Sequence, residues 1–143
     1  MRYQYKQISC YYSKGERILL LPKGEILPFG GGIDIEPVFE LKLPVGKDEL
    51  ERKINECFTF CWSKTVNGFP KGASIVEKYL KVKGFKKVVQ QFELFELTYN
   101  IAEKKYDLRK LLKAADYKCY SGMEMIEMGS AIDFDFIMNL ISA

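Results

Sequence analysis

A change of hydrophobic period within residues 36–62 constrains the fold more than any other feature of the sequence. In residues 36–45, "EPVFELKLPV", apolar and charged residues alternate, which predicts a half-buried strand with Phe39, Leu41 and Leu43 on its inner face. The next apolar residues recur at helical spacing and predict an amphipathic helix; they are Leu50, Ile54, Cys57, Phe58, Cys61 and Trp62. A strand that leads directly into such a helix indicates a domain that combines both elements.

Capping residues mark where helices begin and end. We expect Asp48 to cap the first helix, with Glu51 three residues later in a variant of the capping box, and residues 67–70, "NGFP", to end it. A second helix is predicted to begin after Ser74 and to stop at Gly84. One more short helical turn is expected over residues 85–92.

The remaining segments indicate a sheet. Residues 3–12 and 16–22 flank a Lys-Gly turn and predict a hairpin, whereas the Pro- and Gly-rich residues 22–32 predict a loop. Alternation predicts further strands, and one segment fits either a strand or a helix; the strands are 93–101, 122–128 and 132–141, and the ambiguous segment is 104–112. We therefore predict a single α+β domain over residues 1–143, a mostly antiparallel sheet with two or three helices packed on one face.

Composition narrows the setting and the class of function. The chain of 143 residues is 48% hydrophobic, enough for one core, and its net charge of +3 comes from basic residues scattered among acids without a long basic block. No apolar run approaches the roughly 20 residues that cross a membrane, and the polar start does not fit a signal peptide. We expect a cytoplasmic protein whose four cysteines are free thiols.

The chain contains no histidine. This absence removes the usual general base near neutral pH and the commonest zinc ligand, so we expect no enzyme, metal or cofactor. Cys57 and Cys61 lie one helical turn apart but are too few for a structural zinc site, and we expect both to be buried. The loop "PFGGGID" lacks the Lys-Ser/Thr and the following helix of a phosphate cradle.

Acidic residues are the main candidates for a site. Asp34, Glu36 and Glu40, and later Asp133 and Asp135, alternate within strand-like segments and should project on one side. Two functions stay open for them: a carboxylate and metal-dependent enzyme, or an acidic face that meets a basic protein, where opposite charges speed the encounter.

The tyrosine-rich start leaves a third function open. Tyr3, Tyr5, Tyr11 and Tyr12 are interleaved with Lys6 and Lys14, and such tyrosines can stack on single-stranded nucleic acid. A half-buried sheet explains the same pattern, so a small nucleic-acid-binding module remains the alternative.

The order of these elements resembles a family of contact-dependent growth inhibition immunity proteins. The resemblance rests on the strand "EPVFELKL", the helix "DELERKINECF", the segment "LKVKGFK" at residues 80–86 and the aromatic segment at 92–99. It covers roughly residues 33 to 135.

The resemblance implies an inhibitor. Such proteins bind the C-terminal toxin domain of an effector delivered by a neighbouring cell, often a nuclease, and block it in the cytoplasm. We expect Asp34, Glu36, Asp133 and Asp135 to contact the toxin, with aromatic side chains as anchors and with pairing to a sheet edge as one mode of binding. No membrane, cofactor or direct nucleic-acid partner is expected.

Overall fold

The computed structural model describes residues 4–28 and 30–143, and these form an α+β domain around an eight-stranded sheet. Six strands follow the order β3-β2-β1-β6-β7-β8, while β4 and β5 also pair with β2. The β2–β5 pair is parallel and the other pairs are antiparallel, so the predicted mostly antiparallel sheet is confirmed. The strands are β1 Tyr5–Ser13, β2 Arg17–Leu27, β3 Gly31–Asp34, β4 Phe39–Lys42, β5 Thr65–Asn67, β6 Glu93–Asn100, β7 Lys105–Lys113 and β8 Tyr120–Gly129.

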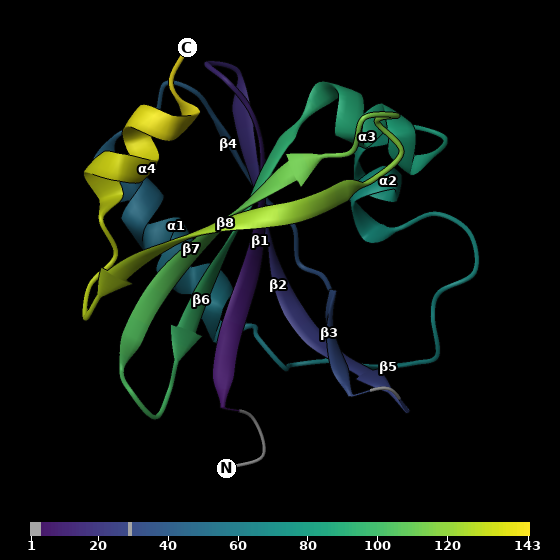
Figure 1. The fold of residues 1–143 in the computed structure, drawn as a ribbon, viewed down its shortest axis with the longest axis horizontal. Helices are drawn as coiled ribbons and strands as arrows, with labels where there is room; N and C mark the ends of the chain where they lie inside the picture. The colour runs from purple at the N-terminus through teal and green to yellow at the C-terminus, as the bar shows by residue number, and fades with distance from the viewer. Residues whose placement is uncertain (1–3, 29) are drawn as a thin grey trace.

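Helices cover both faces of the sheet, which corrects the expectation of two or three helices on one face. Helices α1 (Lys47–Thr59) and α4 (Phe134–Ile141) pack on one face, and α2 (Ile75–Leu80) and α3 (Phe85–Gln91) on the other (Figure 1). The reason lies in β2, where the run from Ile18 to Leu21 is fully buried. Alternate residues of this run pack into the two hydrophobic clusters on opposite sheet faces, so helices must shield both faces from water.

The N-terminal hairpin is confirmed as β1 and β2, but the loop predicted at residues 22–32 is wrong. Strand β2 continues through Pro22 and Gly24 to Leu27, and Gly31–Asp34 forms β3. A Cβ at Gly24 would lie 2.4 Å from the Lys64 carbonyl oxygen, so this glycine permits a close approach of backbones inside the sheet. Tyr3 of the predicted first strand and Phe29 of the predicted loop lie outside the described residues.

Helix α1 differs from the prediction at both ends. Gly46 occupies the N-cap position without a side-chain hydrogen bond, and Asp48 lies in the first turn, where its charge favours the helix dipole. The helix ends at Thr59, well before residues 67–70. Three residues later Trp62 adopts a left-handed φ of 65°, a conformation that does not continue an α-helix. Trp62 still packs against the core and donates from Nε1 to the Tyr5 carbonyl at 2.8 Å.

The two short helices follow the prediction more closely. Ser74 and Glu77 form a complete capping box at the start of α2, and Lys81 ends that helix in the left-handed region. Helix α3 then begins after Gly84, and strands β6 and β8 lie where alternation predicts them. The ambiguous segment at residues 104–112 is the strand β7.

The segment 132–141 is a helix, so the strand predicted there is wrong. Its sequence satisfies both periods: Phe134 and Phe136 alternate with acids, but the buried residues of α4 are Phe134, Ile137 and Ile141, at helical spacing. Asp133 caps the helix and accepts a hydrogen bond from the Phe136 amide at 3.0 Å. Throughout the described residues, no helix has both the length and the apolarity needed to span a membrane.

Candidate functional site

A groove of about 640 Å³ runs between the sheet and α2, on the face that α2 and α3 cover. Strands β1, β2 and β3 place Tyr11, Lys23 and Asp34 on its floor. Glu36 and Lys78 lie along its walls. Two of the four predicted site residues, Asp34 and Glu36, therefore line one cavity.

Asp34 belongs to a polar cluster on the floor of this groove. Its carboxylate accepts hydrogen bonds from Ser9 Oγ at 2.6 Å and from the Tyr11 hydroxyl at 3.2 Å. Lys23 Nζ lies 3.2 Å from Asp34 Oδ1 and 2.9 Å from Glu96 Oε2. The strand register produces the cluster, since Lys23 is opposite Asp34 and Ser9 is opposite Glu96. Asp34 is thus engaged inside the protein by three neighbours.

Burial and neighbouring charges fix the protonation of the cluster. Burial by itself lowers the pKa of Lys23, but the charges of Asp34 and Glu96 outweigh this effect and raise the pKa overall. Burial, followed by the charge of Asp34, raises the pKa of Tyr11 well above its usual range. Lys23 therefore stays charged and Tyr11 stays neutral near pH 7. These two groups can hold a geometry, but neither has the near-neutral pKa of an acid–base catalyst.

Glu36 is an exposed acid that lines the groove and also two further hollows, of about 660 and 230 Å³. One hollow is lined by Val38, Phe60 and Tyr79, and the two aromatic side chains are 36% and 41% exposed. The Tyr79 hydroxyl donates to Glu40 Oε1 at 2.7 Å, which fixes the direction of its ring. Glu36 forms no ion pair or hydrogen bond with another described residue, so its charge is available to a partner.

The other two predicted acids lie elsewhere. Asp133 caps α4, and Asp135 lies in the first turn of the same helix. Asp135 Oδ1 is 3.1 Å from Lys47 Nζ. The expectation that they occupy alternate strand positions is wrong, because the segment is helical. Helix α4 packs on the opposite sheet face from the groove, so the structure does not bring these acids together with Asp34 and Glu36. Their contact with a toxin stays a prediction.

Seven exposed lysines lie between residues 64 and 87, the part of the chain that leads into and forms α2 and α3, and we call them the lysine-rich surface. They are Lys64, Lys71, Lys78, Lys81, Lys83, Lys86 and Lys87. Residues 57–92 hold these seven basic residues and one acid, Glu77, a net charge of +6, while the rest of the chain holds 15 basic and 18 acidic residues, a net charge of −3. Sequence analysis missed this surface because the charge was judged over the whole chain; the signal was local, since residues 78–87 hold five lysines and no acid.

The cysteines offer no catalytic or metal site in the described part of the chain. All four are free, with Cys10, Cys57 and Cys61 buried and Cys119 exposed, as predicted for thiols. Burial raises the pKa of the Cys10 and Cys57 thiols, so they stay protonated and unreactive. Within residues 4–28 and 30–143, no three His, Cys, Asp or Glu side chains are grouped so as to hold a metal ion.

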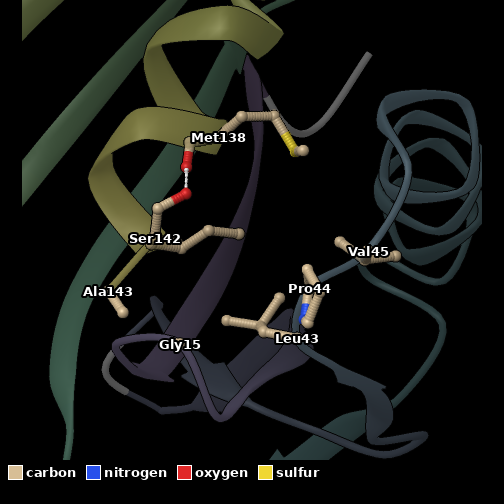
Figure 2. A pocket seen from close by; sticks show the side chains of 8 residues that line it. Gly15, Leu43, Pro44, Val45, Met138, Ser142 and Ala143 are labelled. Atoms are coloured by element: carbon tan, nitrogen blue, oxygen red, sulfur yellow. Dashed lines mark hydrogen bonds between the residues drawn. The ribbon is translucent and has the colours of Figure 1, made fainter.

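An apolar pocket of about 290 Å³ lies on the other sheet face, at the end of α4 (Figure 2). Leu43, Pro44 and Val45, which connect β4 to α1, face Met138 and Ile141 of α4 across it. No charged side chain lines this pocket, and it contains none of the predicted site residues.

Strand β8 forms one edge of the sheet and has ten residues, compared with four in β3 at the other end. Met123 and Met125 on β8 are 51% and 50% exposed. The strand contains neither lysine nor proline, but it carries the exposed Glu124 and Glu127, and its register with β7 shifts at two places. Strand β8 is the longer edge for the predicted mode of pairing, which stays a prediction.

Comparison with known proteins identifies a similar fold but no function. No protein-family model and no curated protein matches the sequence. Among solved structures, the fold is similar to that of NMB0488, a protein of unknown function from Neisseria meningitidis, with a TM-score of 0.60. The two chains are 8% identical over 95% of this chain and 90% of the other. At this identity the likeness concerns the fold alone.

Proposed function

We propose that this chain is an immunity protein that binds and neutralises the C-terminal toxin domain of a contact-dependent growth inhibition effector in the cytoplasm. The observation that carries the proposal is the hollowed surface around Glu36, where Phe60 and Tyr79 are exposed beside a carboxylate that no described residue pairs with. The order of the elements in the sequence, which resembles that immunity family, points the same way. The protein would act without turning over a substrate.

The surface around Glu36 has the composition of a binding site for another protein. Exposed aromatic side chains beside hollows are the usual anchors of protein interfaces, and a few of them supply most of the binding energy. Tyr79 is already oriented by its hydrogen bond to Glu40, so little side-chain freedom is lost when a partner covers it.

Inhibition would follow from coverage of the toxin. A partner seated on the hollows around Glu36 would have its own active site or substrate surface blocked by the bulk of the sheet and α2. Strand β8 offers a second contact, in which an extended segment of the toxin adds to the sheet edge through main-chain hydrogen bonds.

The test is co-expression of this chain with the toxin domain that is encoded beside its gene. We expect growth to be restored and a stoichiometric complex to elute from a sizing column. Tyr79→Ala should weaken protection, whereas Tyr117→Asn should not, because Tyr117 is similarly exposed at 47% but lies in the turn between β7 and β8. Unchanged killing, with no complex on the column, would refute the proposal.

A further inference from the structure

The lysine-rich surface carries seven exposed lysines from a segment, residues 57–92, that contains a single acid. None of its seven lysines forms an ion pair with a described residue. Other lysines without an ion pair, such as Lys14, Lys42 and Lys105, have acids within two residues of them in the sequence, as only Lys78 does among the seven. The acid within the segment, Glu77, is buried and engaged in the capping box with Ser74. The positive charge therefore remains available to another molecule.

A solvated helix face is the ordinary explanation of exposed lysines, but such faces mix both signs of charge. Here α2 and α3 have six and seven residues, so each is only about 10 Å long. Lys78, Lys86 and Lys87 lie on these helices, and Lys81 and Lys83 lie in the short connection between them. Five like charges are thus carried by two short neighbouring elements, where they repel one another most at low salt. A partner of opposite charge would relieve this repulsion.

We infer that the partner presents an acidic protein surface to the lysine-rich surface, and this inference rests on the proposed function. The lysines attract the partner and speed the encounter, while the hollows beside Phe60 and Tyr79 hold it once it has docked. The sign is opposite to that expected from the sequence, because Asp34, Asp133 and Asp135 already have bonding partners within the chain.

The details of this surface favour a protein over a nucleic acid. All seven basic residues are lysines, and none is the arginine whose planar fork binds phosphate with two hydrogen bonds. Glu36 and Glu40 lie beside the same hollow as Tyr79, and their carboxylates would repel a phosphate backbone. The surface of a protein carries both signs, so it can pair with the lysines and also place a basic group near Glu36.

A first experiment tests the charge without the toxin. Fluorescein-labelled poly-L-glutamate and a labelled single-stranded oligonucleotide are titrated with the purified protein at low salt, and anisotropy is recorded. One variant replaces Lys71, Lys83, Lys86 and Lys87 with glutamine. The control variant makes the same change at four exposed lysines outside the surface, which are Lys14, Lys42, Lys105 and Lys118.

We expect poly-glutamate to bind the wild type and the control about equally, and the first variant about tenfold more weakly. Equal loss in both variants, or no binding of poly-glutamate to the wild type, would overturn the inference. Tighter binding of the oligonucleotide than of poly-glutamate would also overturn it and would favour the nucleic-acid-binding alternative.

A second experiment separates this inference from the proposed function. The association rate of the purified toxin domain is measured with both variants at increasing salt. A rate that falls about tenfold in the first variant, and that falls with salt in the wild type, supports the inference. A toxin that binds at the same rate to all three proteins contradicts the inference but leaves the proposed function intact. A toxin that binds none of them refutes the proposed function. The poly-glutamate titration then decides by itself whether the lysine-rich surface binds acidic polypeptides.

Discussion

Replacing Lys23 with methionine tests the cluster on the floor of the groove. The ammonium group lies between two carboxylates, 3.2 Å from Asp34 Oδ1 and 2.9 Å from Glu96 Oε2. Methionine keeps most of the aliphatic stem but removes the charge. The variant therefore leaves Asp34 and Glu96 without the cation that they share.

The expected cost is large for a single substitution. Removing one partner of a buried ion pair costs about 3–5 kcal/mol, because the other charge stays buried without compensation. The side chains of Lys23, Asp34 and Glu96 are 15%, 18% and 17% exposed, so solvent screens them a little, and Asp34 keeps its bonds to Ser9 and Tyr11. We therefore expect the lower end of this range, about 3 kcal/mol of unfolding free energy.

Urea denaturation followed by the fluorescence of Trp62, the single tryptophan, measures this cost. With a slope of about 2 kcal/mol per molar urea, the midpoint should fall by about 1.5 M. The raised pKa of Lys23 means that its contribution is complete below the usual lysine pKa of about 10.4 and is lost only at higher pH. The difference between wild type and variant should thus be the same at pH 7 and pH 9.

Lys47→Met is the matched control, because Lys47 and Asp135 form an exposed pair with side chains 53% and 78% accessible. Such a surface pair contributes at most about 1 kcal/mol. If the two variants unfold at the same urea concentration, the cluster is screened like a surface pair and the reasoning about a buried cation is wrong.

Three further predictions follow from the fold. Ser74→Ala should lower the unfolding free energy by about 1 kcal/mol, because the Glu77 amide loses its capping oxygen; an unchanged melting temperature would contradict this role. Burial, and then the charge of Glu93, raises the pKa of Tyr12 to about 12, above the value of about 10 in the unfolded chain. The unfolding free energy should therefore fall as the pH rises from about 10 to about 12, and Tyr12→Phe should make this fall with pH smaller. A thiol reagent should label Cys119 quickly in the folded protein and all four cysteines in urea, and rapid labelling of a second thiol without denaturant would argue against the buried positions of the others.

Local patterns were reliable where one period dominated or where a cap was explicit. The alternation around Phe39, the helical stripe from Leu50 to Phe58 and the start of a helix after Ser74 were read correctly from the chain. The segment 132–141 was not, because its apolar residues fit a strand and a helix equally well locally. Packing decided between them, since a helix buries Phe134, Ile137 and Ile141 against the core beside α1.

The candidate site depended even more on tertiary structure. Sequence identified Asp34 and Glu36 as candidates. It could not show that Asp34 is paired with Lys23, whereas Glu36 is paired with no described residue. The pairing of β1 with β6 and of β2 with β3 brings Ser9, Lys23 and Glu96 to Asp34 from distant parts of the chain, and no local pattern contains that register.

The sequence by itself determined that this is a mixed domain with a hairpin start, a strand followed by an amphipathic helix, and free buried thiols. These features follow from periodicity and composition, which act over a few residues. Only the tertiary structure decided that helices cover both sheet faces and that Asp34, Asp133 and Asp135 have bonding partners within the chain. Charge complementarity acts through space, and the distances between side chains are fixed by packing and strand register.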